Sequence, residues 1–257
     1  MVIVLQEGAS VDEVTAALQG LGLWTRRLHG SSGPVVLNVE PHSTQVAPDR
    51  ILAVAGVAQV HLPKSAHPLM DRQANRFVLR LRHGDEVELG GDGPVLAAGP
   101  CAVESEAQIR EAASEVARSG ARLLRGGAWK PRTSPYAFAG AGTEALAWLD
   151  AAASANGLGI VTEVMSEQQV GAVAEVADLI QIGARNMQNF ALLAAVGRAA
   201  KPVLLKRARG ASVEEWLLAG EHVLAHGAAQ VILCERGDFA TGPELRGDLD
   251  VGAIALL

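Results

Sequence analysis

Hydrophobic and polar positions follow two different patterns along the chain. Over residues 1–66, short β-branched runs and amphipathic stretches follow one another in the order β-α-β-β-α-β. This order is typical of a ferredoxin-like module. We therefore predict a small ferredoxin-like α+β domain over residues 1–66. The expected strands are Val2–Leu5, Trp24–His29, Pro34–Val39 and Val57–Leu62, and the expected helices are Val11–Leu21 and Pro48 to about Ala55.

A linker with a hairpin is expected at residues 67–94. Apolar and basic side chains alternate over Phe77–Arg82, and the sequence that follows, His83-Gly84-Asp85, is typical of a turn. Val87–Leu89 can pair back as the second strand. Three glycines and Pro94 then interrupt the chain before the pattern changes. This segment is expected to connect the two parts of the chain.

From Val95 onward, short apolar runs alternate with helical stretches. Such runs suit parallel strands that are buried on both faces. Ser105, Ser166 and Ser212 each precede Gln or Glu by three residues and predict helix starts. The alternation predicts a doubly wound sheet or a barrel over residues 95–257. The six expected strands are Val95–Ala98, Arg122–Leu124, Ile160–Thr162, Leu179–Ile182, Val203–Leu205 and Val231–Leu233.

Composition and charge exclude several classes of protein. Hydrophobic residues make up 49% of the 257 residues, so a disordered chain is excluded. A net charge of −6 and 4% aromatic residues argue against binding to nucleic acid. No apolar run reaches the ~18 residues of a membrane helix, and no basic segment introduces a secretory signal. With only two cysteines, Cys101 and Cys234, we predict a cytoplasmic protein without a disulfide scaffold.

Basic side chains gather where the expected parallel strands end. Active sites of parallel α/β architectures form beyond these strand ends, so the side chains are expected on one face. Clustered cations repel one another, and such a cluster is typical of a site for phosphate or carboxylate groups. Ion pairs with Glu104, Glu163 and Glu235 are the alternative, but three carboxylates are fewer than six cations. We therefore predict a site for small polyanionic substrates. The cations are Arg125, Lys130, Arg132, Arg185, Lys206 and Arg236.

Two further features are candidates for metal or nucleophile chemistry. Cys101 lies in a Gly-Pro turn at a strand end, where a metal ligand or nucleophile could lie, although a lone cysteine is more often simply buried. His222 and His226 are four residues apart on one helix face, a spacing that suits a metal ion. They lack the intervening Glu of a metalloprotease helix, so a solvated helix face is the favoured interpretation.

Taken together, the strand-end motifs resemble the type I 3-deoxy-D-arabino-heptulosonate 7-phosphate (DAHP) synthases, in the subgroup with an N-terminal ferredoxin-like regulatory domain. Lys130–Pro135 separates this family from the octulosonate 8-phosphate synthases. The resemblance implies a TIM-type (β/α)8 barrel. It also implies the first step of the shikimate pathway, in which phosphoenolpyruvate condenses with erythrose 4-phosphate to DAHP and phosphate. The motifs are GPCAVES from Gly99, LRGGAWKPRTSPYAF from Leu124, VTE from Val161, QIGARN from Gln181, PVLLKR from Pro202 and ILCERG from Ile232.

The resemblance also implies roles in catalysis. Arg125 and Lys130 would contact the phosphoenolpyruvate carboxylate and the reacting centre. Glu163 would be the third catalytic residue and would position a water molecule or Lys206. Cys101 would be a ligand of a divalent metal ion such as Mn²⁺, which polarises the aldehyde oxygen as a Lewis acid.

Binding roles follow from the same resemblance. Arg185 and Lys206 would hold the phosphoenolpyruvate phosphate, and Arg236 would add to phosphate binding. An aromatic amino acid would act as effector at the N-terminal domain, and the protein would be a homo-oligomer. The erythrose 4-phosphate side would be lined by Lys130, Arg132, Thr133 and Ser134.

The last part of the chain departs from the family pattern. A barrel takes about 200 residues at minimum, whereas residues 95–257 hold six expected strands. The Asp-Pro-Ser-His and Glu-Val-His motifs of the family's seventh and eighth strands do not occur, so of the family's Cys, His, Glu and Asp metal ligands only Cys101 is present. We therefore expect a barrel truncated after about six βα units, with a defective metal site. A catalytically impaired relative with a regulatory or anion-binding role is the alternative function. A related sugar-acid synthase is disfavoured by Lys130–Pro135.

Overall fold

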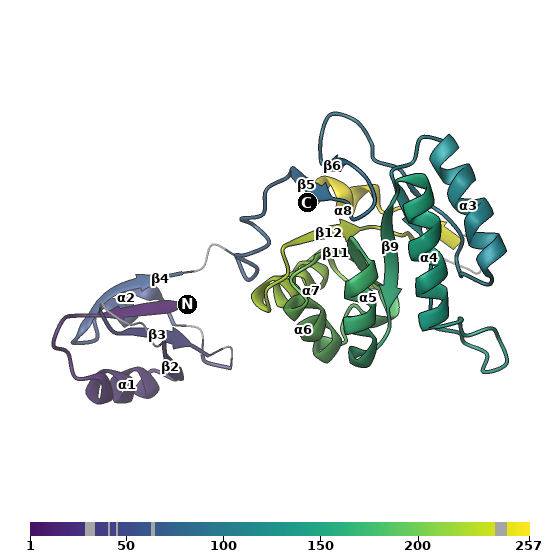
Figure 1. The fold of residues 1–257 in the computed structure, drawn as a ribbon. Coiled ribbons are helices and arrows are strands. Elements are labelled where there is room, and N and C mark those ends of the chain that lie inside the picture. The colour runs from purple at the N-terminus through teal and green to yellow at the C-terminus, as the bar shows by residue number, and fades with distance from the viewer. Residues whose placement is uncertain (29–33, 41, 45, 63–64, 240–245) are drawn as a thin grey trace. The chain divides into compact units, whose positions relative to one another are not determined.

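The computed structural model describes residues 1–257 except 29–33, 41, 45, 63–64 and 240–245. The chain divides into two units, Met1–Pro68 and Leu69–Leu257. The first unit contains a small antiparallel sheet, and the second contains a six-stranded parallel sheet with its helices (Figure 1). No helix in the described ranges is both long and apolar enough to cross a membrane.

The first unit is a four-stranded antiparallel sheet with two helices. Its elements are β1 (Val2–Leu5), α1 (Val11–Gly20), β2 (Thr25–Leu28), β3 (Val36–Val39), α2 (Pro48–Leu52) and β4 (Val57–His61). The strand order is β2-β3-β1-β4, so β1 pairs with both β3 and β4. Ile3, Leu18 and Ile51, from β1, α1 and α2, are fully buried in one core. Both helices therefore pack against the sheet.

Local sequence accounts for most boundaries in this unit. The Ser10 hydroxyl accepts a hydrogen bond from the backbone N–H of Glu13 and caps α1 as predicted. Pro48 lies in the first turn of α2, where its missing N–H costs nothing. The helix ends at Leu52, before the predicted end, because the last turn tightens to three-residue hydrogen bonds. The predicted end of the second strand, residue 29, lies outside the described residues.

Strands β5 (Phe77–Arg80) and β6 (Glu86–Leu89) form an antiparallel hairpin at the start of the second unit. The apolar side chains of this β5–β6 hairpin share a buried cluster with residues near the beginning of the parallel strands. The hairpin therefore closes the amino end of the parallel sheet. The cluster is Leu79, Leu81, Val87, Leu123, Val161 and Leu179.

A buried carboxylate holds the hairpin to the sheet. Asp178 is 3% exposed, and its two oxygens accept hydrogen bonds from the backbone N–H groups of Arg82, at 2.9 Å, and Ile160, at 2.7 Å. Next to it, the Asp150 carboxylate lies 2.7 Å from Nε2 of His83 and 3.2 Å from the Arg82 guanidinium. Charges at this end of the sheet are thus paired or hydrogen-bonded.

The parallel sheet contains six strands in the order β12-β11-β10-β9-β8-β7. The strands are β7 (Ala97–Ala98), β8 (Leu123–Arg125), β9 (Gly159–Val164), β10 (Leu179–Ile182), β11 (Pro202–Lys206) and β12 (Gln230–Cys234). The helices are α3 (Glu106–Arg118), α4 (Thr143–Asn156), α5 (Val170–Val176), α6 (Phe190–Arg198), α7 (Val213–Ala225) and α8 (Val251–Leu256). The remaining elements are 3₁₀ turns at Glu167–Gln169 and Ala184–Asn186 and strands β13 (Asp238–Phe239) and β14 (Arg246–Asp248).

This sheet is a half-barrel, and the doubly wound alternative is wrong. A doubly wound sheet reverses its strand order at a switch point and carries helices on both faces. Here every strand pairs with the next strand in sequence. Leu124, Ile160 and Ile180 pack with the helices, whereas the alternate residues Leu123 and Val161 pack with the β5–β6 hairpin. The helices therefore cover one face of a curved sheet (Figure 1).

Two of the three predicted helix starts hold. Ser105 and Ser212 accept hydrogen bonds from the N–H groups three residues later, at the starts of α3 and α7. The prediction at Ser166 is wrong, because a 3₁₀ turn comes first and the serine hydroxyl makes no capping hydrogen bond. Instead, the Gln169 side chain reaches back to the N–H of Met165 at 3.0 Å.

Candidate active site

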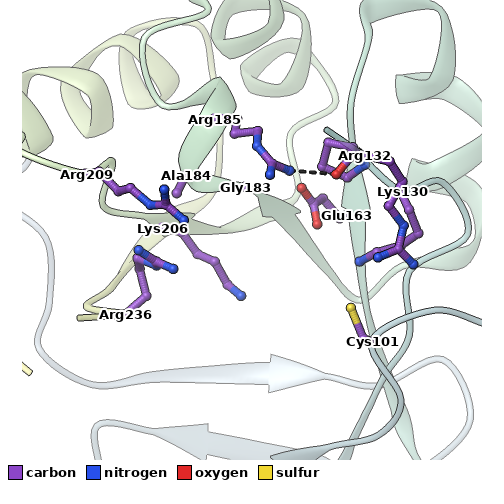
Figure 2. Close-up of a pocket in the computed structure, with 11 residues that line it drawn as sticks. Cys101, Lys130, Arg132, Glu163, Gly183, Ala184, Arg185, Lys206, Arg209 and Arg236 are labelled. Atoms are coloured by element: carbon purple, nitrogen blue, oxygen red, sulfur yellow. Dashed lines mark hydrogen bonds between the residues drawn. The ribbon is translucent and has the colours of Figure 1, made fainter. Parts of the chain in front are cut away.

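A pocket opens beyond the carboxyl ends of the parallel strands (Figure 2). Its volume is about 460 Å³, which suits small metabolites. The residues come from the ends of β9 and β11 and from the loops after β7, β8, β10, β11 and β12. They are Cys101, Lys130, Pro131, Arg132, Glu163, Gly183, Ala184, Arg185, Lys206, Arg209 and Arg236.

The pocket has a large excess of positive charge. Among its described lining residues, six are cations and Glu163 is the single carboxylate. Five of the six predicted strand-end cations lie in it, and Arg125 lies beside it. Cations this close repel one another in a medium of low dielectric constant, so bound anions would stabilise them. The six are Lys130, Arg132, Arg185, Lys206, Arg209 and Arg236.

The alternative of ion pairs within the cluster is not what the structure shows. Glu235 pairs with Arg207, which is not among the residues that line the pocket. In the described part of the chain, neither Glu104 nor Glu163 forms a salt bridge with any of the six predicted strand-end cations. These three carboxylates therefore do not neutralise the five predicted cations that line the pocket.

Lys130 is the most deeply buried cation of the pocket, at 7% exposure. Its backbone N–H donates to the carbonyl of Ala139 at 2.8 Å, which closes the loop after β8. Its side chain crosses directly over Gly127, where an added Cβ would lie 2.9 Å from the lysine Cδ. A side chain at position 127 would displace Lys130, so the glycine keeps space for it.

Glu163 is held in place by its neighbours on β9 and β10. The carboxylate is 7% exposed and accepts a hydrogen bond from the buried amide of Gln181 at 3.1 Å. A Cβ at Gly183 would lie 2.0 Å from the Glu163 Oε1 atom. Glycine at position 183 therefore gives this carboxylate its place at the pocket wall.

The loop after β8 carries the remaining predicted contacts. Arg185 donates a hydrogen bond to the carbonyl of Pro131 at 2.6 Å and so holds this loop from the opposite wall (Figure 2). Arg132 donates to the carbonyl of Phe138 at 3.0 Å. Thr133 and Ser134 are exposed on the same loop and do not line the described pocket. Their roles stay predictions.

Arg125 and Cys101 lie beside each other at the edge of the pocket. The Arg125 guanidinium donates to the carbonyls of Pro100 and Cys101, at 3.1 and 3.4 Å. Partial burial raises the pKa of the Cys101 thiol, but Lys130 and Arg125 outweigh burial, so the pKa is lowered overall. The exposed thiol therefore forms its thiolate more readily than an ordinary cysteine.

Lys206 ends β11 and points into the pocket (Figure 2). Burial lowers its pKa, and the charges of Arg125 and Lys130 lower it further, against the opposing influence of Cys234 and Glu163. Burial also raises the pKa of the Cys234 thiol. A bound anion would offset the repulsion on Lys206 and restore its affinity for a proton.

Arg209 is a pocket residue that the sequence reasoning missed. Only Lys206 and Arg207, which follow the predicted strand Val203–Leu205, were considered there, and Arg207 does not line the pocket. The available signal was position: Arg209 follows the same strand end within three residues and precedes Gly210, whose φ of +66° marks a turn. A basic residue anywhere in a strand-end loop is therefore a candidate for lining this kind of pocket.

The described residues do not by themselves fit a divalent metal ion. No group of three or more His, Cys, Asp or Glu side chains in the described ranges could hold one. Cys101 faces Lys130 and Arg125, and the positive charges of these two side chains repel a metal ion. His222 lies on α7 and His226 caps its C-terminus, and both are exposed, as expected for a solvated helix face; their rings stack with centres 6.4 Å apart.

Comparison with known proteins agrees with these features. Residues 49–254 match the DAHP synthetase I family. The phospho-2-dehydro-3-deoxyheptonate aldolase of Thermotoga maritima is 36% identical over 259 residues, which cover all of this chain and 76% of that protein. The 2-dehydro-3-deoxyphosphooctonate aldolase of Syntrophotalea carbinolica is 35% identical over 59% of this chain and 58% of its own length.

Solved structures give the same picture. The crystal structure of the Thermotoga maritima phospho-2-dehydro-3-deoxyheptonate aldolase (DAHP synthase) superposes with a TM-score of 0.67 at 33% identity, over 99% of this chain and 75% of that one. A truncated form of 3-deoxy-D-arabino-heptulosonate 7-phosphate synthase from the same organism superposes with a TM-score of 0.61 at 39% identity, over 70% of this chain and 64% of that one. This likeness supports the half-barrel as part of a TIM-type barrel.

Proposed function

The chain belongs to the DAHP synthetase I family, and we propose that its basic pocket binds phosphoenolpyruvate and erythrose 4-phosphate for their condensation to DAHP and inorganic phosphate. The activity is that of an aldol-type transferase at the first step of the shikimate pathway. One observation carries the proposal: among the residues that the structure describes, six cations and a single carboxylate line one small pocket at the carboxyl ends of the strands. Two phosphates and one carboxylate supply matching negative charge.

In this proposal the phosphoenolpyruvate phosphate binds between β10 and β12. Arg185, Lys206 and Arg236 line that side of the pocket, and guanidinium forks with an ammonium group suit a phosphate. Arg125 and Lys130 take the carboxylate and the reacting centre. The burial of Lys130 supports this role, because an ammonium group in a dry site stabilises developing negative charge strongly.

Erythrose 4-phosphate is proposed to bind against the loop after β8. Arg132 lines the pocket there, and Thr133 and Ser134 follow it on the exposed part of the loop. Hydroxyl groups and a guanidinium next to one another can hold a second phosphate. The hydrogen bond from Arg185 to Pro131 links this loop to the phosphoenolpyruvate side, so the two substrates would be held in one defined geometry.

Bond formation needs C3 of phosphoenolpyruvate to attack the aldehyde carbon and water to add at C2. In the proposal, the ammonium group of Lys130 stabilises the negative charge that forms on the aldehyde oxygen. Glu163 orients Lys206 or the attacking water, with its own position set by Gln181. Inorganic phosphate then leaves from C2.

Metal dependence is the general expectation for this family. We propose Cys101 as one ligand, because its pKa is lowered and its sulfur lies at the pocket wall. The described residues do not complete a ligand set, so no step is assigned to a metal ion here.

The first unit is proposed to be a ferredoxin-like regulatory module. Its element order and its strand order β2-β3-β1-β4 support this class. An aromatic amino acid is the proposed effector, a homo-oligomer the proposed assembly, and the cytoplasm the proposed location. Titration of the full chain with tyrosine and phenylalanine tests the effector.

A second candidate function is a catalytically impaired relative that binds anions or regulates a partner. The absence of a three-ligand metal cluster among the described residues favours it. Turnover separates the two functions. Phosphate release is measured from both substrates with added Mn²⁺, on the full chain and on an Arg185→Ala variant. Robust release that is lost in Arg185→Ala supports the synthase, whereas phosphoenolpyruvate binding without release supports the impaired relative.

A further inference from the structure

Arg207 follows Lys206 directly but belongs to a different set of contacts. Its Nη1 atom lies 2.9 Å from a Glu235 oxygen and 2.8 Å from an Asp250 oxygen. Its Nε atom donates to the carbonyl of Ala211 at 2.9 Å, and its guanidinium lies 5.9 Å from the centre of the Trp216 ring. The side chains of Arg207 and Glu235 are 15% and 6% exposed. This Arg207–Glu235 pair is therefore largely withdrawn from water and fixed on several sides.

The second oxygen of Glu235 holds the backbone that follows. Its Oε1 atom accepts hydrogen bonds from the N–H groups of Arg236 and Gly237, both at 2.8 Å. Gly237 has a φ of +76°, in the left-handed region that favours glycine. One carboxylate thus binds the guanidinium of Arg207 on one side and fixes a tight turn on the other.

That turn carries a residue of the pocket. Arg236 lines the pocket next to Lys206 and Arg209 (Figure 2), and its Nη1 atom donates to the carbonyl of Gly237 at 3.0 Å. Lys206 and Arg209 carry the same charge as Arg236, so their repulsion opposes the placement of Arg236 in this pocket. Its long side chain also loses rotamer entropy when it is held in one position. An arginine under such repulsion stays in place only if the backbone beneath it is fixed.

We propose that Glu235 and Arg207 are positioning residues, which hold Arg236 in the pocket so that it can bind the phosphate group of the substrate. The proposal rests on the proposed function only for the identity of that anion. Glu235 is suited to the task because both of its oxygens are already engaged, so it does not neutralise Arg236 itself. Arg207 in turn keeps the carboxylate in place from the neighbouring strand end.

The ionisation of the Glu235 carboxylate agrees with a role in positioning Arg236. Burial raises the pKa of Glu235, but the hydrogen bonds from Arg207, Gly237 and Arg236 outweigh burial and lower it overall. Glu235 is therefore ionised at neutral pH and accepts all three hydrogen bonds. Asp250 also pairs with the Arg207 guanidinium, but its side chain is 43% exposed, so it contributes less than Glu235 to holding Arg207.

A double-mutant cycle on the full chain tests the proposal. Glu235→Ala, Arg236→Ala and the double variant are titrated calorimetrically with phosphoenolpyruvate and, separately, with inorganic phosphate. We expect each single variant to bind about 10-fold more weakly, and the double variant to bind no more weakly than Arg236→Ala. If the fold-losses in affinity of the two single variants multiply in the double variant, Glu235 does not act through Arg236 and the proposal is overturned. The matched control is Glu106→Ala, which removes an exposed carboxylate paired with Arg110.

Amide hydrogen exchange gives a readout that needs no ligand. In Glu235→Ala, exchange over residues 235–238 is expected to accelerate while the rest of the half-barrel keeps its protection. Should Glu235→Ala fail to fold, Glu235→Gln keeps an acceptor for the turn and loses the charge pair with Arg207, and its cycle with Arg236→Ala is measured instead. Unchanged exchange in the folded variant contradicts the proposal.

The same experiment separates this proposal from the proposed function. Binding of inorganic phosphate without binding of phosphoenolpyruvate would reject the proposed substrate and leave the cycle with phosphate to decide on Glu235. If neither anion binds, the proposed function fails and the exchange measurement still decides whether Glu235 fixes the turn.

Discussion

The charged side chains are paired at one end of the parallel sheet and clustered with like charges at the other. At the amino end, Asp178 accepts two backbone hydrogen bonds, and Asp150 pairs with His83 and Arg82. At the carboxyl end, the described part of the chain places six cations in one pocket with a single carboxylate. Burying polar groups with partners stabilises a fold, whereas concentrating one sign of charge costs stability. The amino end therefore serves stability, and the carboxyl end serves binding.

The largest expected effect is at the amino end. Asp178→Ala removes the acceptor of the buried Ile160 N–H and of the partly buried Arg82 N–H, so we expect the free energy of unfolding to fall by about 3 kcal/mol. Urea denaturation of the full chain measures it. Asp85→Ala, in the exposed hairpin turn, is the control and should change little. Equal stability of the two variants would mean that Asp178 does not hold the hairpin. Affinity for phosphoenolpyruvate should not change in either variant.

Lys201, which directly precedes β11, and Lys206, which ends it, give the next largest contrast in expected effect. Lys206→Ala removes a pocket cation and is expected to weaken phosphoenolpyruvate binding about 30-fold, with stability unchanged or slightly raised because repulsion is relieved. Lys201→Ala removes a hydrogen bond to the carbonyl of Ala177 and should reduce stability by about 1 kcal/mol without affecting binding. Calorimetric titration and urea denaturation measure both. Equal binding losses in the two variants would contradict the division of roles.

Gly183→Ala tests the wall of the pocket with a smaller change. The new Cβ would lie 2.0 Å from Glu163, so the carboxylate must move. We expect a loss of about 1–2 kcal/mol in stability together with slower turnover. Gly171→Ala in α5 is the control, since nothing lies within 4 Å of its added Cβ and alanine favours a helix. A Gly183→Ala protein that behaves like this control would show that Glu163 has room to move freely.

The smallest expected effect is a shift in thiol reactivity. Because Lys130 and Arg125 lower the pKa of Cys101, its alkylation by iodoacetamide should begin at lower pH than that of an ordinary thiol. Lys130→Ala removes one of these charges, so the midpoint should move to higher pH. Cys234, whose pKa is raised by burial, is the internal control and should react only at higher pH. Mass spectrometry of the two peptides measures both rates, and an unchanged Cys101 midpoint in Lys130→Ala contradicts the assignment.

Much of the site could be predicted because functional side chains lie at the carboxyl ends of the strands in this architecture. Lys206 follows its apolar run directly and Arg185 follows within three residues of the run ending at Ile182, and parallel strands bring such positions to one edge. Arg209 was missed because it lies three residues into a loop, where sequence does not show which way a side chain points. Arg207 illustrates the same limit, since it lies next to Lys206 yet pairs with Glu235.

The sequence by itself determined the element types, the placing of basic residues at strand ends, and the family. These properties depend on local periodicity and on short motifs, which neighbouring residues encode directly. Only the tertiary structure decided between a doubly wound sheet and a half-barrel, because that choice depends on strand order and on which face the helices cover. It also placed Lys206 in the pocket and Arg207 in ion pairs outside it, because pairing depends on contacts between residues far apart in the chain, such as Arg207 with Asp250.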